Sequence, residues 1–490
     1  MNKEVLSFVD KYVNDIKNNS AALFIGAGFS KSSGFVDWKD LIKNVADDLD
    51  LDIEKENDLV SLAQYSYNKN QNRSLINSVI FDEFSKNVDI DENHRILARL
   101  PIFTFWTTNY DSLIEDALRD AKRMVDVKYK NSHLAISLSH RDAIVYKMHG
   151  DKSDPDEAVL IKDDYEKYYR ERTPFVTALC GDLISKTFLF IGFSFSDPNI
   201  DYILSRIRIE YGAGNNRQHY ALFRTLKKED YEEKGTGKFD KAKFEYDTRK
   251  YKLLLDDLKR YNIKALMIND YSEITDILNL ISKRINQNNV FISGSASDYG
   301  RYSKEEALDL ISLLSKNLIK NNFNVISGFG LGVGSAVITG ALEEIYINQK
   351  NINNERLLLR PFPQDISDPD KRQELWKKYR EDMISRAGIS IFVFGNKLEE
   401  GNVVKANGMI EEFEIAKANH NLIVPVGCTG YVSLDIWNEI NANISTYYGD
   451  IDGDLLNAFK KLNVNVDNKN LVNNISFFIK LFDNNKYKSL

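Results

Sequence analysis

At 490 residues the chain is longer than one hydrophobic core usually serves, so two or three domains are expected. A hydrophobic content of 43% and a charged content of 28% are typical of a folded globular protein and exclude a disordered chain. The formal net charge of −7 argues against a general nucleic-acid binder, which normally presents a basic face.

Apolar residues at helical spacing predict that the chain opens with an amphipathic helix over residues 5–16. Charges are spread through this segment and no small-residue cleavage site follows, so a signal peptide is not expected. No apolar run approaches the roughly 20 residues that a membrane-spanning helix needs. We therefore expect a cytoplasmic protein with no membrane association.

Short apolar runs alternate with helical patterns in the first part of the chain, which predicts a parallel sheet covered by helices. The expected strands are residues 21–25, 102–107, 144–148, 188–191, 219–223 and 263–268. A mostly helical pattern over residues 38–84 predicts a helical insertion after the first strand. The charged segment 227–252 is expected to form a solvated helical hairpin or a surface excursion. A helix over 271–285 closes this part.

Residues 286–289, Asn-Gln-Asn-Asn, are the best linker in the chain, and the pattern restarts after them. A helix is expected over 304–320, and strands are expected over residues 290–292, 324–327, 357–359, 389–394 and 422–426. The fold class that follows is α/β, with two doubly wound, Rossmann-like parallel sheets. We expect one domain over residues 1–285 and a smaller one over residues 286–490.

Four short motifs end strand-like runs in the first domain, where parallel sheets place their ligand crevice. They are Gly26-Ala27-Gly28-Phe29-Ser30, Thr107-Thr108-Asn109-Tyr110-Asp111, His149-Gly150-Asp151 and Gly192-Phe193-Ser194-Phe195. The first glycines let backbone approach a diphosphate, and the following helix start offers amide donors. A single Gly-x-Gly is often an ordinary tight turn. The ordered set predicts a dinucleotide site.

Asn109 and His149 are the candidate catalytic residues. Cleavage of a nicotinamide–ribose bond builds positive charge on the ribose, and the amide of Asn109 can position water or ribose hydroxyls without adding a competing charge. An imidazole can accept a ribose hydroxyl proton, because the pKa of histidine ordinarily lies near neutral pH. The structural alternatives are a satisfied core histidine and a helix-capping asparagine. For Asp111, orienting its neighbours or capping the next helix is expected.

These motifs resemble the sirtuin family over roughly residues 1–285. The NAD-binding loop of that family continues with a Ser, a Gly, an Asp and an aromatic residue, matched here by Ser30, Gly34, Asp37 and Trp38, although Phe35-Val36 replaces the usual Ile-Pro. The Thr-Gln-Asn-x-Asp, His-Gly and Gly-x-Ser motifs also have counterparts here. The resemblance implies NAD-binding roles for Gly26, Ala27, Gly28, Ser30, Asp37, Asp111, Gly192, Ser194 and Asn269.

The chain also departs from the sirtuin deacylases, which build part of their acyl-peptide groove on a four-cysteine zinc module. Only Cys180 and Cys428 are present, so no such module, no disulfide framework and no metal site are expected, and both thiols are expected to be buried. Asn109 and His149, 40 positions apart, are also more widely separated than is usual in deacylases. Water is therefore the expected acceptor. Hydrolysis of NAD⁺, as substrate rather than cofactor, is the simplest reaction left.

Glycine-rich segments also end strands of the second domain, at Ser293-Gly294-Ser295 and over residues 327–334. Glycines at alternating positions suit phosphate oxygens that approach the backbone, and a tight packing turn is the structural alternative. Arg380 offers a guanidinium fork and Lys397 a point charge, although each taken singly is more often a solvated surface charge. Glu412 can accept hydrogen bonds from ribose hydroxyls.

This half resembles the SLOG family of nucleotide-sensing domains, and a sirtuin-like domain followed by SLOG is the arrangement of the Thoeris antiphage effectors. The match covers nearly the whole chain, notably residues 56–64, 105–111, 159–165 and 325–334. It implies an NAD⁺ hydrolase that uses Asn109 and His149. The enzyme would stay inactive until SLOG binds a cyclic ADP-ribose isomer from a partner TIR-domain enzyme, and would then deplete cellular NAD⁺ during infection. The candidate signal-binding residues are Gly294, Ser295, Gly328, Gly330, Gly332, Arg380, Lys397 and Glu412.

The same resemblance implies a homo-oligomer, either a tetramer or a filament. Two alternatives to the hydrolase remain open at this stage. A non-catalytic nucleotide sensor or scaffold would bind NAD⁺ without releasing nicotinamide. An ADP-ribosyltransferase would make the same first cleavage but pass the ribose to a protein, which labelled NAD⁺ would reveal.

Overall fold

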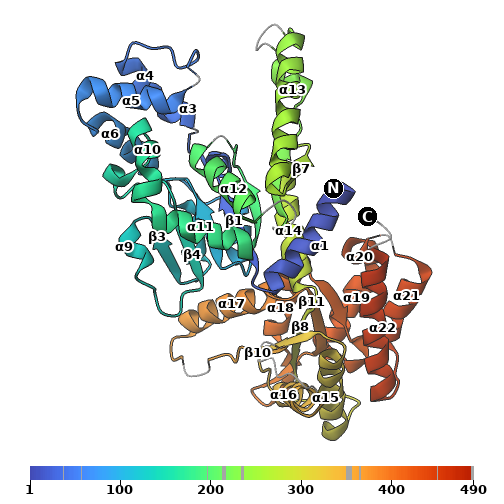
Figure 1. The fold of residues 1–490 in the computed structure, drawn as a ribbon. Coiled ribbons are helices and arrows are strands. Elements are labelled where there is room, and N and C mark those ends of the chain that lie inside the picture. Colours follow the sequence, from blue (N-terminus) through green and yellow to red (C-terminus); the bar gives the residue numbers. More distant parts are fainter. Residues whose placement is uncertain are drawn as a thin grey trace. The chain divides into compact units, whose positions relative to one another are not determined.

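The computed structural model describes residues 1–486 except 37, 57, 196, 212–216, 233–236, 349–355, 364–365 and 450. The chain divides into two compact units, Met1–Ser282 and Lys283–Leu490 (Figure 1). Each unit is built on a parallel sheet with helices packed against it, which confirms the predicted α/β class. In the part of the chain that is described, no helix has the length and apolar character needed to span a membrane.

The N-terminal sheet has seven parallel strands in the order β3-β4-β2-β1-β5-β6-β7. The strands are β1 (Ala21–Ile25), β2 (Thr104–Thr107), β3 (Val125–Lys128), β4 (Ala143–Lys147), β5 (Thr187–Ile191), β6 (His219–Arg224) and β7 (Ile263–Ile268). Six of them match the predicted strands within two residues. Strand order turns back between β1 and β5, and the carboxyl ends of these two strands therefore form the switch point where such sheets bind ligands.

Strand β3 was not predicted, because its sequence alternates valines with Asp126 and Lys128 and contains no continuous apolar run. At the edge of the sheet only every second residue of β3 is fully buried, and these two residues are Asp126 and Lys128, which form an ion pair at 2.7 Å. By contrast, every residue of β1 and of β5 is buried, as expected for central parallel strands.

The predicted helical insertion between β1 and β2 is confirmed. Its helices are α2 (Ala27–Ser30), α3 (Trp38–Leu41), α4 (Lys43–Asp48), α5 (Leu59–Asn70), α6 (Ser74–Phe84) and α7 (Glu92–Arg99). Helices α3–α6 pack around Ile42, Leu62 and Ile80, in a hydrophobic cluster that also takes in Tyr110 and Leu160 from outside the insertion. Arg73, before α6, donates to both carboxylate oxygens of Asp164 at 3.0 Å, which fastens the insertion to α10 (Lys162–Glu171).

The other helices of this unit differ from the sequence prediction in one place. They are α1 (Lys3–Lys17), α8 (Leu113–Asp120), α9 (Asn131–Leu134), α11 (Thr173–Ser185), α12 (Pro198–Tyr211), α13 (Lys241–Leu258) and α14 (Ser272–Asn286). The charged segment 227–252 was expected to form a helical hairpin or a surface excursion; residues 228–231 form a short 3-10 helix, and residues 241–252 belong to the single 18-residue helix α13. Asp240 caps this helix by accepting a hydrogen bond from the backbone N–H of Lys243 at 3.0 Å.

The C-terminal sheet has five parallel strands in the order β10-β9-β8-β11-β14, with its switch point between β8 and β11. The strands are β8 (Asn289–Ser295), β9 (Asn324–Ser327), β10 (Leu357–Leu359), β11 (Ile389–Phe394) and β14 (Leu422–Pro425). The helices are α15 (Lys304–Lys320), α16 (Gly334–Glu343), α17 (Pro369–Ser385), α18 (Asn407–Ala418), α19 (Tyr431–Ala442), α20 (Ile444–Tyr448), α21 (Gly453–Lys460) and α22 (Asn468–Lys486).

Two features of this unit differ from the sequence interpretation. Only Gln287 and Asn288 separate α14 from β8, so the predicted linker 286–289 is largely absorbed into regular structure. An antiparallel hairpin of β12 (Asn396–Glu399) and β13 (Asn402–Lys405), which was not predicted, follows β11.

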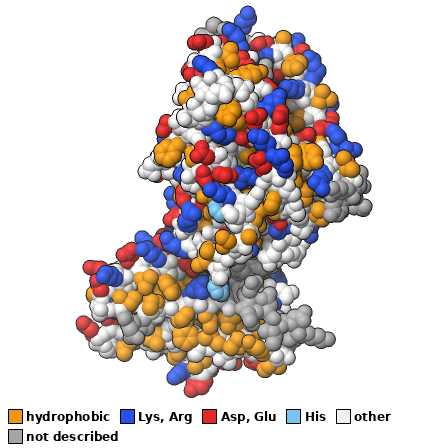
Figure 2. Space-filling view, turned by 60° about the vertical axis from the view of Figure 1, so that its left-hand side comes forward, with side chains coloured by type: hydrophobic (Ala, Val, Ile, Leu, Met, Phe, Trp, Pro, Cys, Tyr) orange, Lys and Arg blue, Asp and Glu red, His pale blue; other side chains and the backbone are white. Residues whose placement is uncertain are grey.

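On the face seen in Figure 2, acidic and basic side chains are interspersed rather than gathered into one basic surface.

Candidate functional site

The loops after β1 and β5 meet in close backbone contact at the switch point of the N-terminal sheet. The backbone N–H of Gly28 donates to the carbonyl of Gly192 at 3.0 Å, and that of Gly26 donates to Ile191 at 2.9 Å. A Cβ on Gly26 would lie 2.8 Å from the Cα of Phe193, and Gly192 has a φ of +65°. The glycines thus allow the backbones of the two loops to come into contact. The backbone N–H of Gly28 is engaged in this contact and is not available to a diphosphate.

Gly192→Ala is expected to destabilise the N-terminal unit by about 1–3 kcal/mol, because the new Cβ would overlap the backbone N of Phe29 and the residue would keep a left-handed φ. Displaced loops should also weaken binding of NAD⁺, the ligand implied by the sequence resemblance, by about tenfold or more. Denaturant unfolding and calorimetric titration measure both effects. Gly181→Ala in α11 is the matched control, since its Cβ would meet nothing within 4 Å. Equal behaviour of the two variants would contradict this account.

Asn109 follows β2 and is held by one hydrogen bond to α2, in the segment after β1, and by one to the end of its own strand. Its Nδ2 donates to the hydroxyl of Ser30 at 3.0 Å. Its backbone N–H donates to the hydroxyl of Thr107, which in turn donates to the carbonyl of Ile25 at 2.8 Å. Asn109 is 6% exposed, and its Oδ1 has no hydrogen-bond partner among the described residues. The side chain is therefore fixed on one side and presents an unused acceptor on the other.

Asp111, rather than Asn109, makes the capping bond at the start of α8. Its Oδ1 accepts a hydrogen bond from the backbone N–H of Leu113 at 3.0 Å, and the residue is 3% exposed. The carboxylate thus has the orienting and capping role that the sequence favoured. A direct contact of Asp111 with NAD stays a prediction.

His149 follows β4 and is almost completely buried, with 1% exposure. Its Nε2 lies 3.2 Å from Oδ2 of Asp197, but neither ring nitrogen has a well-directed hydrogen bond within the described chain. Burial lowers the pKa of His149, and the nearby carboxylate of Asp197 opposes that shift. The imidazole is therefore neutral at pH 7 and able to accept a proton.

Asp197 is a site residue that the sequence analysis missed. Its Oδ1 accepts hydrogen bonds from the backbone N–H groups of Asn199 at 2.9 Å and Ile200 at 3.1 Å at the start of α12. Asp197-Pro198 is the ordinary signature of a helix start, which concealed a second function of the carboxylate. The other oxygen faces His149 because the loop after β5 turns back toward the end of β4.

Buried polar atoms without partners gather around His149. The rings of His149 and Trp38 lie 5.6 and 6.4 Å from that of Tyr165, and the backbone N–H of Asn199 donates to Asp197. The Trp38 Nε1, the Tyr165 hydroxyl, the Asn199 Nδ2 and both His149 nitrogens are buried and have no partner in the part of the protein described. Since buried polar groups are normally hydrogen-bonded, this group is expected where a bound ligand supplies the missing partners.

Of the remaining predicted NAD-binding residues, Ser30 lies within the site, whereas Ser194 and Asn269 are exposed. Ser30 ends α2 and contacts Asn109, whereas Ser194 is exposed in the segment after β5. Asn269 is exposed after edge strand β7, three strand spacings or about 14 Å from β1. Only a distant part of an extended dinucleotide could reach it. The predicted Asp37 lies outside the described residues.

The glycine-rich segments of the C-terminal unit are explained first by packing. A Cβ on Gly330 would overlap the carbonyl of Gly294, and one on Gly332 would overlap that of Ala296. A Cβ on Gly328 would lie 2.8 Å from the ring of Phe362. The loop after β9 therefore presses against the end of β8 at Gly294 and Ser295, which agrees with the packing alternative for these glycines.

Arg380 and Glu412 come together beside β8. Arg380, on α17, is 8% exposed and is not the solvated surface charge that the single residue suggested. Its Nη1 lies 2.7 Å from Glu411, its Nε lies 3.5 Å from Glu412, and its guanidinium lies over the Phe362 ring at 5.0 Å. Glu412 also accepts a hydrogen bond from the Ser293 hydroxyl at 2.6 Å, and burial raises the pKa of its carboxyl.

Lys397 lies on β12, where it pairs with Glu399 of the same strand at 3.2 Å, and its side chain is 40% exposed. It is at the same edge of the sheet as Ser295, because β12 follows directly after β11. Among the described residues, no group of three His, Cys, Asp or Glu side chains could hold a metal ion. Neither Cys180 nor Cys428 is in a disulfide, and both are half-buried rather than fully buried as predicted.

Comparison with known proteins finds similarity over the full chain. Residues 104–245 match the profile of the SIR2-like domain, and residues 273–482 match that of the Sir2- and TIR-associating SLOG family. A protein of Bacillus cereus (strain MSX-D12) named "NAD(+) hydrolase ThsA" is 51% identical over 99% of this chain and all of its own length. Proteins with the same name from Cytobacillus dafuensis and Acinetobacter baumannii are 47% and 43% identical, over 91% and 94% of this chain and 90% and 95% of their own lengths.

Proposed function

The chain belongs to the ThsA family of NAD⁺ hydrolases, and on that premise we propose that its N-terminal unit cleaves NAD⁺ to nicotinamide and ADP-ribose at the loops that follow β1, β2, β4 and β5. The observations that carry this proposal are the buried group of unpartnered polar atoms around His149 and the unpartnered Oδ1 of Asn109, which follows the neighbouring strand β2. A core that served only packing would leave few such atoms unbonded. Bound NAD⁺, through its amide and ribose hydroxyls, together with the attacking water, would supply hydrogen-bond partners for these buried atoms.

The positions of Asn109 and His149 suit hydrolysis of the glycosidic bond. Nicotinamide leaves as a neutral group with the electron pair of the broken C–N bond, and the ribose carbon becomes positively charged. Because the Nδ2 of Asn109 is held by Ser30, its Oδ1 is the atom available to accept a hydrogen bond from water or a ribose hydroxyl. Neutral His149 can take the proton released when water adds to that carbon, and Asp197 stabilises the resulting imidazolium.

We propose further that the C-terminal unit binds a cyclic ADP-ribose isomer, made by a TIR-domain enzyme, near Arg380 and Glu412. Arg380 already has two carboxylate neighbours, of which Glu411 has a 36% exposed side chain. A phosphate of the signal could replace Glu411 at the guanidinium, since a bidentate phosphate is among the strongest partners of Arg. Such an exchange would make the signal bind an active state of the protein more tightly than an inactive one. To shift the ratio of active to inactive protein from 1:99 to 99:1, the two affinities must differ by about 5.5 kcal/mol.

The biological consequence that we propose is depletion of cellular NAD⁺ during phage infection, in the cytoplasm and by a homo-oligomer. The similarity to the Sir2- and TIR-associating SLOG family supports the pairing with a TIR-domain enzyme. Size-exclusion chromatography with light scattering, with and without a cyclic ADP-ribose isomer, tests the oligomer. A monomer in both conditions would contradict it.

Arg380→Ala is expected to give a folded protein that binds NAD⁺ but needs at least about tenfold more cyclic ADP-ribose isomer for half-maximal nicotinamide release, a loss of about 1.4 kcal/mol or more. The measurement is release of nicotinamide from NAD⁺ across a titration of each isomer. Arg386→Ala, at the exposed end of the same helix, is the matched control and should respond as the unsubstituted chain does. A normal response of Arg380→Ala would place the sensor elsewhere.

A further inference from the structure

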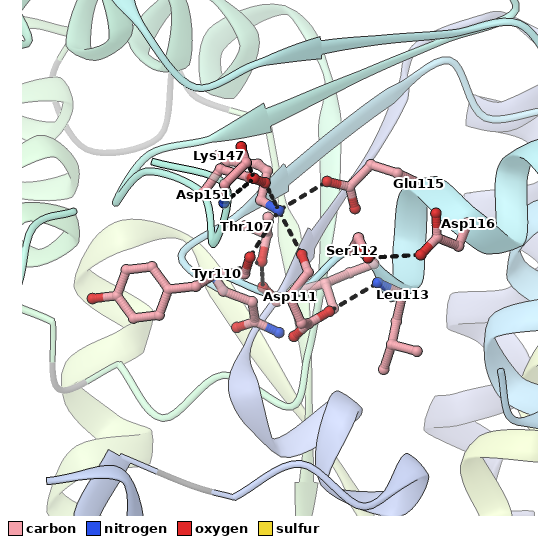
Figure 3. A network of polar contacts seen from close by, with 12 residues as sticks. Thr107, Tyr110, Asp111, Ser112, Leu113, Glu115, Asp116, Lys147 and Asp151 are labelled. Carbon is pink, nitrogen blue, oxygen red and sulfur yellow. Dashed lines mark hydrogen bonds and ion pairs between the residues drawn. The ribbon is translucent and has the colours of Figure 1, made fainter. Parts of the chain in front are cut away.

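Lys147, the last residue of β4, is a fully buried lysine with four oxygen partners (Figure 3). Its Nζ donates to the backbone carbonyl of Tyr110 at 3.2 Å and to that of Asp111. It also donates to Oε1 of Glu115 at 2.9 Å and to Oδ2 of Asp151. Two backbone groups and two carboxylates thus converge on one ammonium group.

These partners belong to the two segments that carry the proposed reacting residues. Tyr110 and Asp111 directly follow Asn109, whereas Asp151 follows His149 by two residues. The strands themselves are paired side by side, with Thr107 of β2 opposite Lys147 of β4. The ammonium group therefore ties together the segments after β2 and β4 just beyond the point where the hydrogen bonds of the sheet end.

The ends of the network are also fixed. Asp151 accepts hydrogen bonds from the backbone N–H of Ser153 at 2.9 Å and from its hydroxyl at 2.6 Å. Asp111 is held at its side chain by the N–H of Leu113. The carboxylates around Lys147 raise the pKa of its ammonium, so the lysine stays charged and keeps its N–H donors at any physiological pH.

Stability alone gives little reason for a charge at this position. A buried ion pair is often no more stabilising than apolar side chains of similar volume, because desolvation offsets the attraction. Here one carboxylate oxygen, Oε2 of Glu115, is buried without a partner among the described residues, and burial raises the pKa of that carboxyl. What the network does supply is a defined position for two loops.

We propose that Lys147 is a positioning residue for NAD⁺ hydrolysis, which holds Asn109 and His149 at a fixed spacing by binding the segments that follow both. This inference rests on the proposed function, in which those two residues act on NAD⁺. Misplacement of reacting groups by about 1 Å can lower a rate about 100-fold. The loops after β1 and β5 are joined instead by the backbone bond between Gly28 and Gly192, so NAD⁺ affinity should depend little on Lys147.

The test is Lys147→Met in the full chain, assayed for nicotinamide release with NAD⁺ and a cyclic ADP-ribose isomer at which the unsubstituted chain turns over. We expect kcat to fall about 100-fold and KM for NAD⁺ to change less than about threefold. Lys128→Met is the matched control. Lys128 is a 3% exposed lysine at the end of neighbouring strand β3, paired with Asp126 at 2.7 Å. Unchanged kcat in Lys147→Met, or an equal fall in both variants, would overturn the inference.

Lys147→Met removes the ammonium partner of both Glu115 and Asp151. Asp151 keeps its two hydrogen bonds from Ser153, whereas Glu115 becomes an unpaired buried carboxylate, so the double variant Lys147→Met/Glu115→Leu separates stability from positioning. We expect Tm to recover in the double variant while kcat stays about 100-fold low, since the carbonyls of Tyr110 and Asp111 still lack their donor. Recovery of kcat together with Tm would show a purely structural role. If neither variant folds, Asp151→Asn, which weakens one partner of Lys147, provides the test. A fall in kcat of about tenfold with KM retained would support the positioning role, and a kcat equal to that of the unsubstituted chain would overturn it.

Asn109→Ala, measured in parallel, distinguishes a failure of this inference from a failure of the proposed function. Turnover retained in Asn109→Ala would refute the catalytic assignment itself, whatever Lys147→Met shows. An inactive Asn109→Ala beside a fully active Lys147→Met would refute only the positioning role.

Discussion

Replacing Asn109 with alanine is expected to lower kcat for nicotinamide release by about 10³-fold while NAD⁺ binding is retained. The residue is 6% exposed, and its side-chain Oδ1, which has no partner in the described structure, is free to accept a hydrogen bond from water or a ribose hydroxyl in the proposed reaction. An interaction needed only as charge develops on the ribose affects turnover rather than ground-state affinity. Steady-state release of nicotinamide, together with calorimetric NAD⁺ titration of the same preparation, measures the two separately.

Ser30→Ala is the graded control for this prediction. It removes the hydroxyl that holds the Nδ2 of Asn109 but leaves the amide itself, so we expect a fall in kcat of about tenfold, between the unsubstituted chain and Asn109→Ala. A variant Asn109→Ala that loses NAD⁺ affinity in the same proportion as turnover would identify Asn109 as a binding residue. Unimpaired turnover would remove it from the site.

The sequence predicted best those elements whose signals are local. The strand over residues 263–268 and the helix over residues 304–320 have the predicted bounds. The helix begins with Ser303 as cap and with a capping box to Glu306, and the strand is an apolar run interrupted only by Lys264. The hairpin β12–β13 was missed because Asn396 to Lys405 is rich in charged and polar residues and has no apolar alternation.

The contacts of the site depend on strand order, which a pattern along the chain does not contain. Asn109 and His149 were predictable because each follows an apolar run and each suits the chemistry. The partnership of His149 with Asp197 requires β4 and β5 to be in one parallel sheet, with the loop after β5 directed back across its carboxyl end. The four partners of Lys147 likewise meet only because β2 pairs with β4.

The glycine-rich loop after β9 shows that one sequence pattern can have two physical causes, phosphate binding and close backbone packing. Glycines at residues 328, 330 and 332 suit a bound phosphate, but a Cβ at the last two would collide with the backbone at the end of β8 and of the residue that follows it. Close backbone approach is thus sufficient to explain them. For signal binding the stronger structural argument comes from Arg380, which is buried and paired with carboxylates that a phosphate could replace.

The activity of the unsubstituted chain is expected to be full at pH 7 and to fall only as the pH drops through the lowered pKa of His149, with His149→Ala about 10²- to 10⁴-fold less active at neutral pH. Burial lowers the pKa of His149 below its ordinary value, so the neutral, proton-accepting imidazole predominates at pH 7 and is lost only as the pH falls through that lowered pKa. The pH dependence of kcat/KM reports this group in the free enzyme.

Asp197→Asn should move the acidic limb of that profile further toward low pH, because the Asp197 carboxylate is what raises the pKa of His149 against the effect of burial. His219→Asn is the matched control: His219 is a buried histidine of β6 whose pKa burial lowers to about 4, and its Nδ1 accepts a hydrogen bond from Phe188 at 3.1 Å. Both histidines take up protons more readily in the unfolded chain, so stability also falls below about pH 6.5 and folding must be followed at each pH. If the acidic limb of the kcat/KM profile shifts in His219→Asn but not in Asp197→Asn, the loss of activity at low pH would be due to unfolding rather than to protonation of His149.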